Sequence, residues 1–432
     1  MSNMSTIKGF ADLYAPESRL YTFMEDAARR IFSAYGYGEL RIPIMEYTEL
    51  FCRSIGVETD VVQKEMYTFP DRKGRSLTLR PEATAGIVRS YIEHNCHARE
   101  DISKVFSFGP MFRYERPQKG RMRQFHQIDC ECLGAHEPQI DAEILLMLMH
   151  FFRELGLSEL RPELNTLGCG ECRPAFRKLL AKFLRGLDPA SLCENCRRRM
   201  ETNPMRVLDC KVPSCREHTA GAPRILDHVC GTCNEHFKVV LGILDKSSTP
   251  YSLNPRLVRG LDYYMRTTFE VVSSSIGAQG SVAGGGRYDG LVSQLGGPDI
   301  PGIGFACGME RLALMLADKR QDSGAKPDFY IAVLVPDATD TALMAAQTMR
   351  EAHLSGELSF EAKSMKSQLR QASRRNADYC LLMGEDELAA HTVIIKHMGS
   401  GDQVSIPLIS LKDWAEIRYE DKLQKQRKGN YR

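Results

Sequence analysis

The sequence has no apolar run that approaches the roughly 20 residues needed to cross a bilayer as a helix. Its first ten residues lack the apolar segment of a secretory signal peptide. Neither sign of charge is in excess, because 57 lysines and arginines are balanced by 55 aspartates and glutamates, for a net charge of +2. Any contact with a nucleic acid must therefore come from local basic patches. We expect a cytoplasmic protein with no membrane partner.

A phosphate-binding P-loop is also absent from the stretch richest in glycine. Residues 284–286 are Gly-Gly-Gly, but no Gly-Lys-Ser/Thr follows them. Since glycine lets the backbone approach a ligand closely, this run predicts a binding site of another kind. With 432 residues the chain is long enough for two or three domains with large cores.

Cysteine, by contrast, is plentiful and clustered. Eight of the fourteen cysteines form four close pairs, namely Cys169 with Cys172, Cys193 with Cys196, Cys210 with Cys215, and Cys230 with Cys233. Disulfides are rare in the cytoplasm, whereas such pairs can each supply two ligands of a tetrahedral zinc site. The spacing predicts structural zinc in one or two four-thiolate sites, without indicating which pairs combine. Reduced thiols and a redox role are the alternatives.

The first part of the chain has clear periodicities. Apolar residues at helical spacing predict a helix over residues 16–35, and residues 39–46 read as a strand. Two short strands, 66–69 and 76–79, enclose a turn, and a helix runs to residue 93. Strands at 104–113 and 123–133 enclose a charged loop. In the second of these strands, alternation places Gln127, Asp129 and Glu131 on one face, which indicates a solvent face or a polar pocket.

Two later stretches carry the most specific pattern. Residues 257–264 are Leu-Val-Arg-Gly-Leu-Asp-Tyr-Tyr, an extended run that composition alone would make a buried strand. Residues 283–290 are Ala-Gly-Gly-Gly-Arg-Tyr-Asp-Gly. In this order they resemble the two histidine-specific signatures of histidyl-tRNA synthetases, a class II aminoacyl-tRNA synthetase family. Residues 16–46 resemble class II motif 1, Phe-Arg-Tyr-Glu at 112–115 resembles motif 2, and residues 302–311 resemble motif 3.

The resemblance implies a fold and an activity. The fold is an α+β catalytic domain, an antiparallel sheet flanked by helices, at residues 1–165 and 251–320, interrupted by the cysteine-rich insertion at 166–250. The activity is ATP-dependent ligation of L-histidine to the 3′ end of tRNA(His) through histidyl-adenylate, releasing pyrophosphate and AMP. Mg²⁺ would accompany ATP, and motif 1 would form a homodimer. The alternative is a non-catalytic histidine-binding paralogue, the regulatory subunit of ATP phosphoribosyltransferase.

The resemblance also assigns site residues. Histidine would be bound by Glu82, Ala83, Thr84, Gln127, Glu131, Tyr263 and Tyr264, although Glu82 and Thr84 could instead cap a helix. ATP would be bound by Arg113, Glu115, Arg121 and Arg311, and Arg113 and Arg259 would flank the reacting α-phosphate. Arg116 and Gln118 would face the tRNA acceptor end. A solvated basic hairpin is the alternative interpretation of this charged loop.

The end of the chain predicts a separate domain. After a polar linker at residues 321–326, apolar strands alternate with helices over 327–420, which indicates a small α/β domain. It resembles the anticodon-binding domain of class IIa synthetases. Lys366, Arg370 and Arg374 recur on one helix face, as an RNA-facing stripe or a solvated basic face. We expect the basic tail, residues 421–432, to be disordered.

Overall fold

The computed structural model describes residues 4–57, 59–273, 280–317, 319 and 326–429. The chain divides into two compact units, Met1–Gln321 and Asp322–Arg432, each with its own hydrophobic core. The division falls within the predicted linker, of which residues 321–325 lie outside the described part. No helix in the described ranges is both long enough and apolar enough to cross a membrane.

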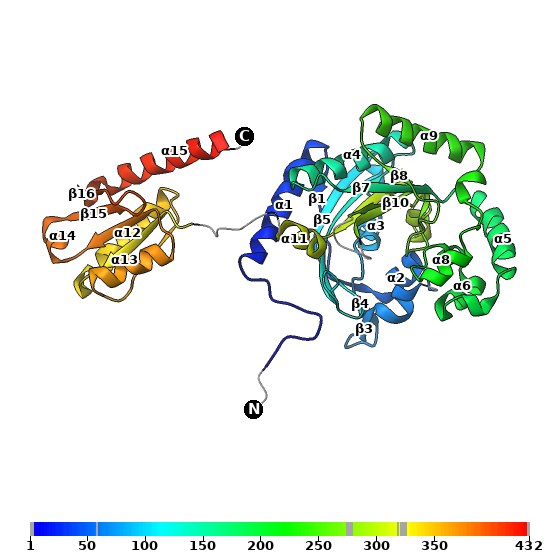
Figure 1. Cartoon of the computed structure of the whole chain (residues 1–432), viewed down its shortest axis with the longest axis horizontal. Helices are drawn as coiled ribbons and strands as arrows, with labels where there is room; N and C mark the ends of the chain where they lie inside the picture. Colours follow the sequence, from blue (N-terminus) through cyan, green and yellow to red (C-terminus); the bar gives the residue numbers. More distant parts are fainter. Residues whose placement is uncertain (1–3, 58, 274–279, 318, 320–325, 430–432) are drawn as a thin grey trace. The chain divides into compact units, whose positions relative to one another are not determined.

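An eight-stranded sheet forms the centre of the first unit, in the order β1-β5-β6-β11-β10-β9-β7-β8 (Figure 1). Its inner strands are antiparallel, while the two-residue edge strands β1 and β8 pair in parallel. The strands are β1 Gly38–Glu39, β5 Ser103–Phe112, β6 Gln124–Leu133, β7 Arg161–Thr166, β8 Ser252–Leu253, β9 Met265–Val272, β10 Ser281–Arg287 and β11 Gly302–Gly308. The predicted antiparallel sheet is therefore confirmed, with parallel pairing only at its edges.

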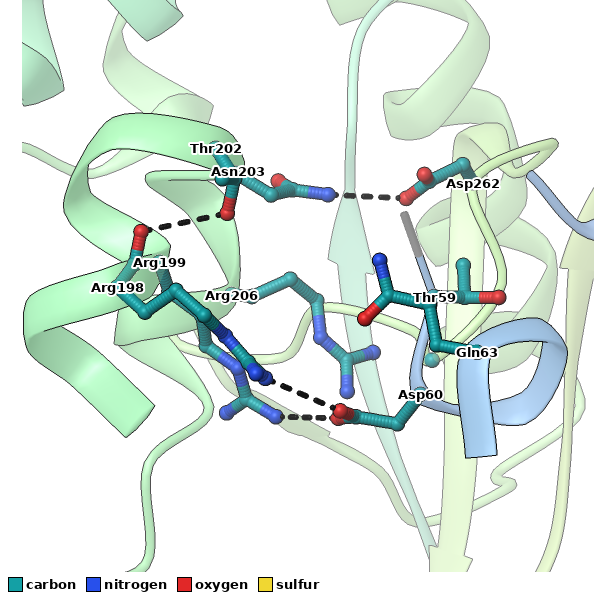
Figure 2. A pocket seen from close by; sticks show the side chains of 10 residues that line it. Thr59, Asp60, Gln63, Arg198, Arg199, Thr202, Asn203, Arg206 and Asp262 are labelled. Atoms are coloured by element: carbon teal, nitrogen blue, oxygen red, sulfur yellow. Dashed lines mark hydrogen bonds and ion pairs between the residues drawn. The ribbon is translucent and has the colours of Figure 1, made fainter. Parts of the chain in front are cut away.

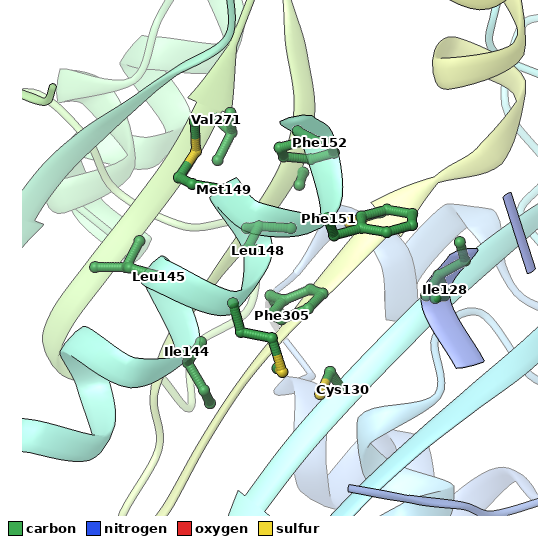
Figure 3. Packing of buried hydrophobic residues seen from close by; sticks show 14 of the residues in the cluster. Ile128, Cys130, Ile144, Leu145, Leu148, Met149, Phe151, Phe152, Val271 and Phe305 are labelled. Carbon is green, nitrogen blue, oxygen red and sulfur yellow. The ribbon is translucent and has the colours of Figure 1, made fainter. Parts of the chain in front are cut away.

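Helices cover one face of this sheet with apolar side chains. These are α1 Glu17–Ala34, α4 Pro138–Glu154, α9 Gly231–Lys246 and α11 Met309–Ala317. Figure 3 shows Phe151 and Leu148 of α4 beside Phe305 of β11, with Ile128 and Cys130 of β6 nearby. Because side chains alternate along a strand, burying Ile128 and Cys130 under the helices turns Asp129 and Glu131 to the opposite face.

That opposite face holds the polar site. Helix α3 Thr84–Glu93 lies against β6, and the loop at residues 257–264 packs beside it through Tyr263 and Tyr264. Composition alone would make residues 257–264 a buried strand, but the structure shows a loop with a turn, and β9 begins only at Met265. The strand alternative is wrong. Arg259 pairs with Glu270, Asp262 accepts from Asn203, and the rings of Tyr263 and Tyr264 pack against each other, so these side chains do not alternate across a sheet.

A second small sheet contains β2 Met45–Tyr47, β4 Ser76–Leu79 and β3 Tyr67–Pro70, next to α2 Thr48–Ile55. The predicted hairpin is confirmed. The single strand predicted at residues 39–46 is instead divided between β1 of the large sheet and β2 of the small one. Pro43, which cannot donate to a ladder, lies in the gap between them.

The cysteine-rich insertion is helical. Its elements are α5 Cys172–Arg185, α6 Glu194–Thr202, α7 Met205–Leu208 and α8 Pro213–His218, followed by α9, which returns to pack on α4 (Figure 1). The core of the insertion is continuous with residues of the catalytic site, because Phe176 and Leu180 belong to the same buried cluster as Tyr263 and Tyr288. The insertion is thus firmly seated on the catalytic part of the unit.

The second unit is a five-stranded sheet, β13-β12-β14-β15-β16, with helices packed against it. Its elements are β12 Phe329–Val333, α12 Thr339–Glu351, β13 Gly356–Leu358, α13 Met365–Arg374, β14 Tyr379–Met383, α14 Glu385–Ala390, β15 Thr392–His397, β16 Gln403–Pro407 and α15 Leu411–Gly429. The predicted small α/β domain is confirmed. The expected disordered tail is wrong up to Gly429, because α15 continues through most of it.

Candidate active site

Glu131 is the centre of a hydrogen-bonded network on the polar face of β6. Thr84, at the first turn of α3, donates through Oγ1 to Oε1 of Glu131 at 2.6 Å. The hydroxyl of Tyr288 donates to Oε2 at 2.5 Å. The Glu131 side chain is only 1% exposed. Two fixed hydroxyls and complete burial hold this carboxyl group in one orientation.

Burial shifts the acidity of this group strongly. Loss of solvent raises the pKa of Glu131 to about 8, and the hydrogen bonds from Thr84 and Tyr288 only partly oppose that rise. Burial also raises the pKa of Asp129 well above its ordinary value, although Arg80 lies close enough to oppose the rise. Asp129 and Glu131 are both 1% exposed, so this strand face is buried and not a solvent face. Such shifts concentrate at functional sites.

Glu82 makes the contacts of a helix cap. Its carboxylate accepts from the backbone nitrogens of Thr84 at 2.8 Å and Ala85 at 3.0 Å, at the start of α3. The capping interpretation is therefore confirmed for Glu82, but not for Thr84, whose hydroxyl donates to Glu131. Two carboxylate oxygens can accept about four hydrogen bonds, so Glu82 keeps capacity for a further donor. Ala83, also assigned to the pocket, is fully buried.

Glycines of the two motif strands make room for site side chains. A methyl group on Gly284 of β10 would lie 2.3 Å from Nη1 of Arg259. One on Gly302 of β11 would lie 2.2 Å from the ring of Tyr288. The prediction that these glycines admit a ligand to the backbone is therefore corrected, since protein side chains occupy the space beside them.

Arg259 reaches from the 257–264 loop to the sheet. Its Nη1 pairs with Oε1 of Glu270 at 2.5 Å, and its guanidinium lies 5.5 Å from the ring centre of Tyr264. The ring of Tyr264 lies 4.6 Å from that of Tyr263. Nε of Arg259 is buried and, among the described residues, has no hydrogen-bond partner. A donor left without an acceptor in a buried setting is suited to a ligand oxygen.

A second group of arginines surrounds the motif 2 loop. Arg113 donates through Nε to the carbonyl of Pro81 at 2.8 Å and lies over Phe125, and no carboxylate in the described part of the chain pairs with it. Arg121 forms an ion pair with Glu115. Arg311 donates to the carbonyl of Ser281.

These arginines repel one another electrostatically. Burial first, and then the positive charge of Arg121, lower the pKa of Arg311, with a smaller effect of Arg113. Like charges held together in a partly buried setting favour a polyanion that would neutralise them. The structure thus brings together all four residues that were assigned to ATP. It also pairs Glu115 with Arg121, which had been assigned separate contacts.

The remaining predicted residues differ in setting. Oε1 of Gln127 is buried and has no hydrogen-bond partner within the described residues, so it is available to accept from a ligand. Arg116 and Gln118 are exposed in the motif 2 loop. In the second unit, Lys366, Arg370 and Arg374 are all exposed on α13, so they share a face as predicted.

The eight paired cysteines gather into two groups of four. Cys169, Cys172, Cys230 and Cys233 form one, and Cys193, Cys196, Cys210 and Cys215 form the other, with all sulfurs of a group within 4.8 Å. The Sγ atoms of Cys169 and Cys172 lie 3.6 Å apart, and those of Cys193 and Cys210 lie 3.9 Å apart. Four sulfurs around a zinc ion at about 2.3 Å would be about 3.8 Å apart, so both groups fit a tetrahedral metal. The outermost pairs combine with each other, and the inner pairs likewise.

Sequence reasoning missed two partners in the site. Tyr288 lies in the second signature, so the motif itself held a signal for it, whereas Glu270 belongs to no motif. Its contact with Arg259 depends on the pairing of β9 with β10, which brings Glu270 opposite Gly284. Local sequence carries no information about that register.

Known proteins give a consistent comparison. The family model for "Histidyl-tRNA synthetase" matches residues 9–312, and that for "Anticodon binding domain" matches residues 328–417. A "Histidine--tRNA ligase" from Oleidesulfovibrio alaskensis is 66% identical over 94% of this chain and 98% of its own length. One from Nitratidesulfovibrio vulgaris is 64% identical over 94% and 97%.

A solved structure agrees over nearly the full length. Apo histidyl-tRNA synthetase from S. aureus is 33% identical, covers 96% of this chain and 100% of its own, and superimposes with a TM-score of 0.79. The predicted class II catalytic domain with an anticodon-binding domain is therefore confirmed, and the regulatory-paralogue alternative is not favoured. The chain belongs to the histidyl-tRNA synthetase family.

Proposed function

We propose that this enzyme ligates L-histidine to the 3′ end of tRNA(His) in two steps at the site around Glu131. The observation that carries the proposal is the buried carboxyl of Glu131, fixed by Thr84 and Tyr288. The names of its close relatives support the same reaction. ATP is the energy source, and histidyl-adenylate is the intermediate.

Histidine recognition rests on the chemistry of imidazole. A neutral imidazole has one N–H donor and one acceptor nitrogen. In the proposal Glu131 accepts from the N–H, a tyrosine hydroxyl from Tyr263 or Tyr264 serves the other nitrogen, and Gln127 uses its unpartnered Oε1. Glu82 holds the α-ammonium group. An isosteric side chain without these groups would leave buried partners unpaired, which costs affinity.

The first step is in-line attack of the histidine carboxylate on the α-phosphorus of ATP. A new oxygen–phosphorus bond forms, the bond to the bridging oxygen breaks, and pyrophosphate leaves with that electron pair. Arg113 and Arg259 stabilise the negative charge that grows on the α-phosphate. Arg121 and Arg311 bind the triphosphate. When Arg121 leaves its ion pair with Glu115, the Glu115 carboxylate accepts a hydrogen bond from the adenine amino group.

Magnesium ions fit the carboxylates near this arginine group. Mg²⁺ takes oxygen ligands and is held by one or two carboxylates plus phosphates. Glu270 lies within electrostatic range of Arg311, and its carboxylate would hold such an ion. When bound, it would neutralise phosphate charge.

In the second step the terminal hydroxyl of tRNA attacks the carbonyl carbon of the adenylate, and AMP leaves. Arg116 and Gln118 contact the acceptor end, because both are exposed on the loop that also carries Arg121. Lys366, Arg370 and Arg374 form the anticodon-facing surface. Exposed basic side chains of this kind bind phosphate in a salt-dependent way.

Three further properties belong to the proposal. The two cysteine groups bind structural zinc, since their geometry fits four thiolates around one ion. The enzyme is a homodimer through the motif 1 region, where Ile44 and Met45 are 46% and 47% exposed. Tyr47 and Phe69, which lie outside motif 1 in the small sheet, are also exposed. It acts in the cytoplasm, where its fourteen free cysteines stay reduced.

Histidine-dependent exchange of pyrophosphate into ATP tests the proposed activity. Histidine alone among the amino acids should support exchange, and Glu131→Gln should raise the KM for histidine more than the KM for ATP. Equal stimulation by other amino acids, or none by histidine, would refute it. Charging of tRNA(His) transcripts tests the second step.

A further inference from the structure

Three side chains of the insertion hold the 257–264 loop, two through its backbone carbonyls and one through the side chain of Asp262. Nη1 of Arg206 donates to the carbonyl of Arg259 at 2.8 Å. Nδ2 of Asn203 donates to Oδ1 of Asp262 at 3.0 Å. Nη1 of Arg173 donates to the carbonyl of Tyr264 at 3.0 Å. Figure 2 shows Asn203 and Arg206 facing this loop across a small pocket.

The loop needs such support because it belongs to no strand. Its backbone nitrogen at Asp262 reaches the carbonyl of Ile55 only at 3.3 Å. Buried carbonyls without partners are costly, and the insertion supplies the donors. Arg206 anchors the main chain of Arg259, the residue whose side chain extends to Glu270 and the proposed α-phosphate site.

The other side of the pocket is tied down as well. Arg198 and Arg199 of α6 pair with Asp60 at 3.3 and 2.8 Å (Figure 2). Asp60 precedes the helical turn Val61–Glu65, and the carbonyl of Glu65 accepts from the backbone of Tyr114 in the motif 2 loop. The insertion therefore connects to both active-site loops.

The cysteine groups set the position of these donors. Arg173 follows Cys172 directly, and Asn203 and Arg206 lie between Cys196 and Cys210 of the other group. Fixing the sulfurs around a common centre fixes the short helices α6 and α7 that carry the donors. Helices this short are not stable alone, so their geometry depends on these cross-links.

We propose that Asn203 and Arg206 are positioning residues for amino-acid activation, which hold the 257–264 loop so that Arg259 and the two tyrosines meet histidine and ATP. This role rests on the proposed function. It makes the insertion part of the activation machinery, in addition to any contact with tRNA. Integrity of the Cys193 group is then required for fast adenylation even without tRNA.

An exchange of partners tests the contact between Asn203 and Asp262. Asn203→Asp places two carboxylates at hydrogen-bond distance, which repel. The double variant Asn203→Asp with Asp262→Asn restores one donor and one acceptor in reversed order. We expect Asn203→Asp to lower the kcat of histidine-dependent pyrophosphate exchange about tenfold, and the double variant to recover most of it. A loss that arose from anything other than this contact would give no recovery.

Arg206 is tested by Arg206→Ala and Arg206→Lys, with Arg185→Ala as control. Arg185 is exposed at the end of α5, in the same insertion. Arg206→Ala should lower kcat about tenfold, lysine should rescue partly because it lacks the planar fork, and Arg185→Ala should match the wild type. Amide hydrogen exchange should become faster in the peptide covering residues 257–264 in the two single variants Arg206→Ala and Asn203→Asp. It should not become faster in the double variant or in the Arg185→Ala control.

Metal content and melting temperature of the full chain are measured in parallel. The proposal would be overturned if both single variants, Arg206→Ala and Asn203→Asp, had wild-type amide hydrogen exchange rates and a wild-type kcat of pyrophosphate exchange. So would failure of the double variant to recover while it remains folded and metal-loaded. If the wild type shows no histidine-dependent exchange, the proposed function fails, but the amide exchange comparison still decides whether the insertion holds the loop.

Discussion

Glu131 in β6 and Gly304 in β11 are paired directly across the sheet, and a methyl group on Gly304 would lie 1.5 Å from Oε2 of Glu131. The carboxyl group can reach Thr84 and Tyr288 only because this neighbour has no side chain. Gly304 is thus a requirement of the proposed histidine pocket and not only of the strand.

Gly304→Ala is therefore expected to displace Glu131. Overpacking a buried site typically costs about 1–3 kcal/mol, so the melting temperature should fall and the KM for histidine should rise. Gly308→Ala, in the same strand, is the control for stability, because within the described residues no atom lies within 4 Å of its added methyl group. Thermal unfolding and pyrophosphate exchange are the measurements. Equal melting temperatures for the two variants would contradict the packing argument.

The raised pKa of Glu131 predicts a pH dependence of stability. The folded protein holds this proton until about pH 8, whereas the unfolded chain releases it near the ordinary value of 4.5. Its contribution to the free energy of unfolding is thus fully present below pH 4.5 and is lost as the pH rises to 8 and above. Glu131→Gln removes this titration while keeping the shape of the side chain.

Melting temperatures without histidine, compared between wild type and Glu131→Gln across this pH range, provide the measurement. The wild type should lose more stability toward high pH than the variant. Asp129, whose pKa burial also raises, will leave a residual slope in both proteins. Parallel curves would show that Glu131 ionises normally in the folded state.

Arg259→Ala is expected to reduce the turnover of adenylation. Removal of one preorganised donor to a transition state typically costs about 10²–10³ in rate, and Arg259→Lys should recover only part of it. Arg256→Ala serves as the structural comparison, because Arg256 in the same segment binds Oγ1 and the carbonyl of Thr219 at 2.7 and 3.0 Å.

Single-turnover formation of histidyl-adenylate separates these effects. Arg259→Ala should slow the chemical step with a modest change in melting temperature, whereas Arg256→Ala should act mainly on melting temperature. If Arg259→Ala unfolds, the ion pair between Arg259 and Glu270 is required for the stability of the fold. A wild-type rate would exclude Arg259 from catalysis.

Metal analysis tests the pairing of the cysteines. The wild type should carry about two zinc ions per chain, one in each four-thiolate site. Cys169→Ser and Cys230→Ser should each remove one, and their combination should remove no more, because both belong to one group. Adding Cys193→Ser should remove the second. Cys380→Ser, in the second unit, is the control and should leave the content unchanged. Zinc near zero in the wild type would contradict the metal assignment.

Much of the fold was predictable because its signals are local. The alternation in β6 separated Ile128 and Cys130 from Asp129 and Glu131, and helical periods located α1 and α12. The order of the motifs identified the family, which the relatives confirm. By contrast, composition alone would make the loop at residues 257–264 a strand, because buried tyrosines give the same apolar pattern in a loop and in a strand.

The sequence by itself determined the spacing of the cysteine pairs, the alternation of the polar strand and the identity of the motifs, since each depends on neighbours along the chain. Only the tertiary structure decided which pairs combine, since Cys172 and Cys230 are 58 residues apart. It also decided that Arg259 meets Glu270, that Gly304 makes room for Glu131, and that Arg206 supports the active-site loop. These contacts depend on strand register and on how the insertion folds back, which no short stretch of sequence encodes.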